Sequence, residues 1–258
     1  MARIFIANVG VNSFYQRKYR IMSPIFTNGS FEFISIKERS NIIGNTIPTY
    51  SKIKCVNSIH KLSYYLPKKV KTYRVHDDPE FMTFTYGDST KNSRSANLKY
   101  IRSGDYLFFL ARLVTFENSN FYHKKGSFYL IGYLKVEDIF ISEEDINENR
   151  LLLKNNAHFK RYELGYENIG EFIIIKGSEK ESQRFKKAVP VNKKFCDEVL
   201  RTKEGKMFNW KKGTEIQRIG SYTRVIRTFI DEKELHSLWA KFWKIINSHI
   251  NSNELQNM

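Results

Sequence analysis

The sequence has few cysteines and no long hydrophobic run. Its 258 residues include 2 cysteines. Cys55 and Cys196 are far apart and lie outside any CxxC or Cys/His ligand spacing, which excludes a disulfide framework and a cysteine-based metal site. No stretch of about 18 apolar residues occurs, so the sequence predicts no membrane-spanning helix. The apolar opening segment soon meets Arg17 and Lys18, and we therefore expect no secretory signal and a cytoplasmic location.

The common catalytic signatures are also missing. The sequence has no P-loop, GxGxxG, HExxH or GxSxG pattern, which removes the usual marks of nucleotide hydrolases, dinucleotide enzymes, zinc proteases and serine hydrolases. The acidic-x-Lys triplet of metal nucleases occurs at 204–206 and 231–233, but neither triplet lies on a predicted strand. In a chain this rich in charge, such triplets arise by chance and do not identify a nuclease.

Acidic side chains are scarce relative to basic ones. The chain has 43 Lys and Arg against 27 Asp and Glu, a net charge of +16 and a pI of about 9.7. So large an excess attracts polyanions, and nucleic acid is the first candidate because phosphate contacts release condensed counterions. An acidic membrane surface or an acidic protein would use the same charge, so a lipid or acidic-protein binder remains an alternative.

Hydrophobic residues make up 41% of the chain and aromatic residues 15%, which is enough for a sizeable core and excludes a disordered chain. Runs of β-branched and aromatic residues bounded by turn residues predict a strand-rich fold. The expected strands span residues 4–9, 31–36, 81–86, 106–113, 128–136 and 172–176. The fourth and fifth are long and apolar, and we expect them to form a hairpin at the centre of a barrel-like sheet.

Helices are expected in three places. Ser142 and Asp145 resemble a capping box that opens a helix to about residue 153. Asn192 can cap a helix that carries Phe195 on its apolar face, and residues 231–249 predict an amphipathic C-terminal helix. We expect a single domain over residues 1–250, with 40–74 as a surface insertion and 251–258 as a flexible tail.

Acidic residues lie on both sides of the predicted strand at 81–86, and we call residues 76–88 the acidic segment. Asp77, Asp78, Glu80 and Asp88 place four carboxylates close together in the sequence, with His76 beside them. Such a group can hold a divalent ion or act as acid and base. Asp and Gly are also ordinary turn residues, and because the sequence favours that role here, it assigns no metal site.

Amide, ring and hydroxyl side chains supply candidate ligand contacts. Amides can hydrogen-bond a base edge bidentately and rings can stack on it, whereas the competing interpretation is ordinary turn chemistry. The candidate nucleotide-binding residues are Asn8, Asn12, Tyr86, Asp88, Asn156 and His158. Small hydroxyls beside arginines can form an anion cradle, and the alternative is a solvated basic loop. The candidate phosphate-binding residues are Ser178, Arg184, Arg218, Ser221, Thr223 and Arg224.

These segments together resemble the nucleotide modification associated domain 3 family. The resemblance lies in ANVGVN at 7–12, SPIFTNGSFEFISI at 23–36, HDDPEFMTFTYGD at 76–88, LKYIRSGDYLFFLARL at 98–113, NNAHFKR at 155–161, IKGSEKESQRFKKAVPV at 175–191 and IGSYTRVIRTFID at 219–231. It implies an α+β fold with a PUA-like mixed β-barrel core, peripheral helices and the C-terminal amphipathic helix. The PUA-like class includes EVE, YTH and ASCH domains, some of which hold single or modified bases.

Two functions follow as hypotheses. The first is a protein of DNA modification or defence that binds DNA or RNA and recognises one modified base in a PUA-like pocket, with no cofactor required for binding. Extruding a base costs a few kcal/mol, which stacking and phosphate contacts can offset. The alternative is a DNA-acting enzyme, either an Mg²⁺-dependent nuclease or a base-modifying enzyme, with Asp88, Asp78 and His158 as candidate catalytic residues.

Overall fold

The computed structural model describes residues 3–10, 18–39, 41–42, 44–91, 93–121, 126–192, 195, 225–228 and 232–250. Its strands are β1 (Ile4–Val9), β2 (Ser23–Ile25), β3 (Thr85–Ser89), β4 (Tyr106–Glu117), β5 (Asn120–Phe121), β6 (Ser127–Phe140), β7 (Phe172–Gly177), β8 (Gln183–Pro190) and β9 (Val225–Thr228). The helices are α2 (Glu143–Glu148), α3 (Arg150–Leu153), α4 (Ala157–Glu163) and α6 (Glu232–Ile250), with 3₁₀ turns η1 (Leu62–Tyr65), η2 (Lys68–Val70) and η3 (Ser93–Tyr100).

The described strands form one mixed sheet of nine strands. Its main path runs β3-β7-β6-β4-β1-β9, while β2 and β5 pair with β4, and β8 pairs with β6. Strands β4 and β6 form the expected long antiparallel hairpin, whereas β1 and β2 pair with β4 in parallel. The α+β class is therefore confirmed. The expected barrel is not, because among the described residues the sheet ends at β3 and β9 and is not closed.

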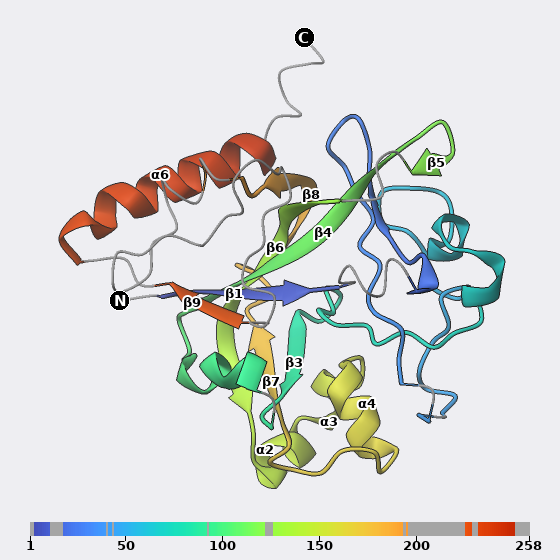
Figure 1. Cartoon of the computed structure of the whole chain (residues 1–258). Helices are drawn as coiled ribbons and strands as arrows, with labels where there is room; N and C mark the ends of the chain where they lie inside the picture. Colours follow the sequence, from blue (N-terminus) through green and yellow to red (C-terminus); the bar gives the residue numbers. More distant parts are fainter. Residues whose placement is uncertain are drawn as a thin grey trace.

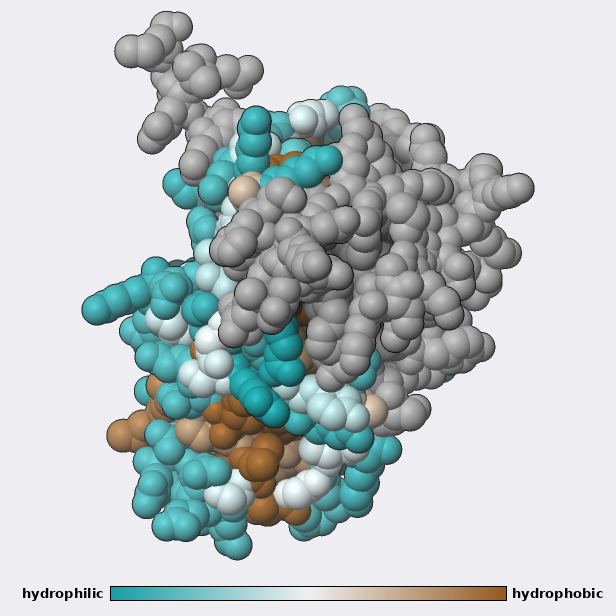
Figure 2. All heavy atoms as spheres, turned by 90° about the vertical axis from the view of Figure 1, so that its left-hand side faces the viewer, coloured by the Kyte–Doolittle hydropathy of each residue, from teal (hydrophilic) through white to brown (hydrophobic). Residues whose placement is uncertain are grey.

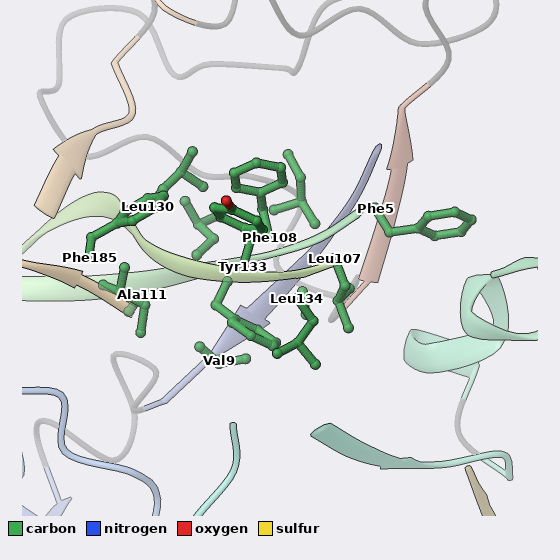
Figure 3. Close-up of a cluster of buried hydrophobic side chains, with 14 of the residues drawn as sticks. Phe5, Val9, Leu107, Phe108, Ala111, Leu130, Tyr133, Leu134 and Phe185 are labelled. Atoms are coloured by element: carbon green, nitrogen blue, oxygen red, sulfur yellow. The ribbon is translucent and has the colours of Figure 1, made fainter. Parts of the chain in front are cut away.

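The main hydrophobic core lies on the central strands. Figure 3 shows part of it, with Phe5 from β1, Phe108 from β4, Tyr133 and Leu134 from β6, and Phe185 from β8. Each of these is at most 9% exposed, as the apolar runs in the sequence predicted. Continuous apolar strands are typical of a sheet that is covered on both faces.

Helix α6 covers one side of this sheet near β8 (Figure 1). Phe242 and Ile246 come from its predicted apolar stripe, and both are buried in the core. The Phe242 ring lies 5.0 Å from Phe108 and 6.0 Å from Phe195, and the Phe195 N–H donates to Asn192 as the predicted cap requires. Among the described residues, no helix is both long enough and apolar enough to cross a bilayer.

Two expected strands need correction. Residues 31–36 form no strand, and within them the structure has one isolated bridge, from Ile25 to Phe31. Residues 81–84 form a turn, and β3 begins only at Thr85. Glu80 holds this turn because its carboxylate accepts the N–H groups of Met82 and Thr83. A side chain that satisfies turn amides competes with strand pairing, a tendency that apolar content alone does not reveal.

The predicted insertion contributes to a second hydrophobic cluster. Tyr50, Leu62, Tyr65 and Val70 pack there with Ile34 and several neighbours. Figure 1 shows this stretch, coloured light blue to cyan, on the side of the molecule opposite α6. The predicted capping box at Ser142 is present and begins α2. The single helix expected from there to residue 153 is instead two helices, α2 and α3. Helices α2 to α4 lie together beside β7 and β3 (Figure 1).

Candidate functional site

A cluster of buried polar side chains lies where α4 packs against β3. Its histidine, His158, is placed by the cap of α4: the Asn156 side-chain oxygen accepts the N–H groups of His158 and Phe159 at 2.9 and 3.2 Å. The Asn156 amide nitrogen donates to the Thr85 hydroxyl at 3.3 Å. Because the cap fixes the first turn of α4 and also contacts β3, it sets the position of the imidazole.

Gly87 lets the backbone of β3 lie directly against the His158 ring. A Cβ atom at residue 87 would lie 2.6 Å from Cδ2 of His158 and 3.0 Å from its Cγ, which is closer than carbon atoms can approach without displacement. The Gly87 N–H donates to Oδ2 of Asp78 at 2.9 Å. The glycine in TYGD therefore serves close packing, which is a common reason for glycine within a strand.

Two histidines, two glutamates and one arginine form a chain of buried contacts, which we call the buried ring. Nδ1 of His158 lies 2.7 Å from Oε2 of Glu167, and Nδ1 of His76 lies 3.2 Å from Oε2 of Glu38. Arg161 joins the two glutamates: its Nη1 donates to Glu167 at 2.9 Å and its Nε to Glu38 at 3.0 Å. The two imidazole rings meet edge to face at 5.0 Å between centroids.

The charges of the buried ring depend on these contacts. Burial opposes ionisation of Glu38, but hydrogen bonds from His76 and Arg161 outweigh it and hold the pKa of Glu38 below its usual range. The pKa of Glu167 is lowered in the same way, by His158 and Arg161 acting against burial. Burial, followed by the charge of Arg161, lowers the pKa of His76 to about 4. At neutral pH the His76 imidazole is therefore uncharged and keeps a nitrogen lone pair.

Asp78 lies beside the buried ring, and one of its carboxylate oxygens has no hydrogen-bond partner among the described residues. Its Oδ2 atom accepts from Gly87 and lies 4.0 Å from Nε2 of His158. Its Oδ1 atom is buried and has no hydrogen-bond partner in the part of the chain that the structure describes. Burial raises the pKa of Asp78 well above its usual value, and nearby Asp88 and Asp77 raise it further against the Gly87 hydrogen bond. Buried polar atoms are rarely left without a hydrogen-bond partner in folded proteins, so this oxygen is a place where water, an ion or a ligand would bind.

The other carboxylates of the acidic segment have different partners. Asp77 accepts from the Ser35 hydroxyl at 3.1 Å, and burial together with Glu80 raises the pKa of Asp77 to about 6. Asp88 accepts from the Tyr86 hydroxyl at 3.1 Å and from the backbone of Ser89. The carboxylates of this segment thus have different hydrogen-bond partners although they influence one another's pKa, and Asp78 is the one grouped with both histidines.

Two of the candidate nucleotide-binding residues, Asn156 and His158, contact β3, the strand that carries Tyr86 and Asp88. Four of the candidates are buried. Tyr86 and Asp88 lie on β3, His158 lies on α4, and Asn156 caps α4. The two ends of the Asn156 amide already have partners inside the protein. Asn8 lies on β1, which is separated from β3 by β7, β6 and β4 in the sheet. Asn12 falls outside the described residues.

Among the candidate phosphate-binding residues, the structure describes Ser178 and Arg184. The Ser178 N–H donates to the Lys135 carbonyl at 2.8 Å. The Arg184 side chain is only 13% exposed, donates to the Phe31 carbonyl and lies 3.5 Å from Glu32, so its guanidinium is engaged within the fold. Four candidates lie outside the described residues: Arg218, Ser221, Thr223 and Arg224.

Sequence reasoning missed three members of the buried ring: Glu38, Arg161 and Glu167. Arg161 follows His158 by one helical turn on α4, a spacing that places two residues on one face, and this was the available signal. The pairing of Arg161 with Glu38 spans 123 positions, and no local pattern predicts it. The assembled site, with imidazoles, a carboxylate and one unsatisfied oxygen, can ligate a cation or transfer a proton.

Comparison with known proteins identifies the family. A family model described as nucleotide modification associated domain 3 matches residues 3–237. Searches of curated proteins and of solved structures found no match. The family match covers most of the chain, including the acidic segment, α4 and the whole buried ring. The chain therefore belongs to the nucleotide modification associated domain 3 family.

Proposed function

We propose that this chain binds nucleic acid in the course of DNA modification and that its cationic surface contacts the phosphate backbone. The family supplies the link to nucleotide modification. The charge supplies the means of binding, because a surface that neutralises phosphates releases their condensed counterions. DNA and RNA share this backbone chemistry, so both belong in the test.

The distribution of charged side chains between interior and surface is the main support for this proposal. Among the described residues, the buried acidic side chains number seven, namely Glu32, Glu38, Asp78, Glu80, Asp88, Asp105 and Glu167. The same described residues include two buried basic side chains, Arg161 and Lys176. Within the described part of the chain, folding therefore buries more acidic than basic side chains, which strengthens the surface effect of the net charge of +16. Figure 2 shows a face that is hydrophilic over most of its described surface, with hydrophobic atoms gathered on its lower part.

The finer proposal concerns a single base. Tyr86 and Asp88 are hydrogen-bonded to each other on β3, and His158 packs against Gly87 of the same strand. A PUA-like protein would hold a flipped base near such groups. Because these side chains are buried, a base would reach them only after a local movement of the chain. A strand-rich α+β core supports the PUA-like relationship at the level of fold class only.

Binding measurements at several salt concentrations test the proposal. We expect the chain to bind oligonucleotides with a logarithmic affinity that falls linearly with the logarithm of salt concentration. A panel of oligonucleotides with single modified bases tests the finer claim, because a base reader prefers one member at every salt concentration. Affinity for neither DNA nor RNA at low salt would refute the proposal, and binding to acidic vesicles alone would identify the lipid alternative.

The enzymatic alternative is favoured by one observation, the unsatisfied oxygen of buried Asp78. Because no described protein group donates to that atom, it is available to a ligand, an ion or a water molecule. If the chain is an enzyme, Asp78→Asn abolishes turnover of modified or unmodified DNA and spares nucleic-acid binding, because surface contacts are unchanged. A pure reader would form no product with any divalent metal, and Asp78→Asn would then leave binding and base preference unaltered.

A further inference from the structure

We propose that His76, Asp78 and His158 bind one divalent transition-metal ion. One potential ligand atom from each of the three side chains lies within 4.8 Å of the others. The three residues are 8%, 6% and 4% exposed. The loop that ends at Asp78 supplies two of them and the first turn of α4 supplies the third, so elements separated in the sequence converge on one point.

The two imidazoles each make a hydrogen bond to a carboxylate, as metal-binding histidines commonly do. Nδ1 of His76 is engaged by Glu38 and Nδ1 of His158 by Glu167. A carboxylate that accepts the proton of one ring nitrogen fixes the tautomer and orients the other nitrogen as a ligand. Since both Nδ1 atoms are occupied, Nε2 is the nitrogen that remains on each ring, and Nε2 of His158 faces Asp78 at 4.0 Å.

The electrostatic balance of the cluster also favours a cation. Arg161 is shared between Glu38 and Glu167, so one guanidinium faces two carboxylates before Asp78 is counted. Burying an uncompensated charge is costly, and the orphaned Oδ1 of Asp78 adds the cost of an unmade hydrogen bond. A bound dication would offset both, because it accepts electron pairs from the carboxylate and the imidazoles.

The donor set selects the kind of metal. Two imidazole nitrogens and one carboxylate oxygen suit Zn²⁺, Fe²⁺ or Co²⁺, whereas Mg²⁺ and Ca²⁺ prefer oxygen ligands throughout. With metal–ligand distances of about 2.0–2.2 Å, tetrahedral ligand atoms are about 3.3 Å apart. The atoms here, which lie within 4.8 Å of one another, must therefore move closer by up to about 1.5 Å, which small rotations of the three side chains can supply. Three protein ligands leave at least one coordination position for water or a substrate oxygen.

Metal titration of the purified full chain tests the proposal without nucleic acid, so its outcome is independent of the proposed binding function. After treatment with a chelator and dialysis, Zn²⁺ or Co²⁺ is added and followed by calorimetry, elemental stoichiometry and the visible spectrum of Co²⁺. We expect one ion per chain and no comparable uptake of Mg²⁺. Failure to retain one equivalent of either transition metal overturns the proposal.

Matched variants assign the site. Asp78→Asn keeps the size of the side chain and an acceptor for Gly87, and it should weaken Zn²⁺ affinity at least about 100-fold, more than loss of a supporting carboxylate does. Asp77→Asn is the control for charge alone: it neutralises the neighbouring carboxylate, which bonds to Ser35, and it should weaken affinity far less than Asp78→Asn because it removes no ligand. Equal affinity in the Asp78→Asn and Asp77→Asn variants would overturn the assignment.

Two further variants separate ligation from folding. His158→Asn retains a donor near the place of Nδ1 and removes Nε2, so it should lose the site while circular dichroism shows a folded chain. Glu167→Gln leaves all three ligands in place and should weaken Zn²⁺ affinity by about 10-fold, because the His158 imidazole is held less firmly in its orientation. If His158→Asn does not fold, Asp78→Asn decides the question, because a neutral amide relieves buried charge and should fold as well as the original side chain.

Discussion

Replacement of Arg161 by methionine tests how far the buried ring holds the fold together. Arg161 is 5% exposed and bonds to both Glu38 and Glu167. Methionine keeps much of the side-chain volume but leaves two buried carboxylates without their cation. Removing one partner of a buried ion pair costs about 3–5 kcal/mol, and we expect the free energy of unfolding to fall by that amount.

Urea unfolding of metal-free protein, followed by circular dichroism, measures this loss as a shift of the midpoint at constant slope. Arg150→Met is the matched control, because Arg150 pairs with Glu163 at the surface with its side chain 50% exposed, and such pairs contribute less than about 1 kcal/mol. Arg161→Lys should lie between the two, since an ammonium group cannot bridge both glutamates as a planar guanidinium does. Equal losses of unfolding free energy for Arg161→Met and Arg150→Met would show that Arg161 does not stabilise the fold through Glu38 and Glu167.

Other substitutions and one modification test separate contacts. Gly87→Ala should destabilise the chain by about 1–3 kcal/mol because its Cβ overlaps the His158 ring; in urea unfolding, the loss should shrink in a His158→Ala background, and an unchanged loss would place the clash elsewhere. Asn156→Ala should cost about 0.5–2 kcal/mol through loss of the α4 cap; a change of base preference at unchanged stability would instead support a reading role. Burial, then Glu32, raises the pKa of the Cys55 thiol from 9.0 to about 12, so at pH 8 its thiolate fraction falls about a thousandfold and mass spectrometry should find slow alkylation until the protein unfolds. Alkylation of folded Cys55 as fast as in urea would contradict that shift.

The sequence predicted those parts of the fold that depend on local pattern. The run at β1 was placed correctly because continuous apolar residues lie on a buried strand. The hairpin of β4 and β6 and the capping box at Ser142 also follow from neighbouring residues. Closure of the sheet depends on long-range pairing, and the barrel prediction is not confirmed among the described residues.

The candidate site was predicted in part for the same reason. Asp78 and His158 were both chosen from the sequence, as chemically capable residues in turns beside predicted strands or helices. Their meeting depends on the packing of α4 against β3, which Gly87 permits. Glu38 could not be found, because its partner Arg161 lies 123 positions away and a glutamate in an extended segment has no distinguishing local pattern.

Anomalous X-ray diffraction from crystals grown with Zn²⁺ tests the metal centre most directly. We expect a single strong peak at the zinc absorption edge, from an ion bonded to Nε2 of His76, Nε2 of His158 and a carboxylate oxygen of Asp78 at about 2.0–2.2 Å. Crystals that diffract well but show no peak there, with Oδ1 of Asp78 hydrogen-bonded to an ordered water, would contradict it.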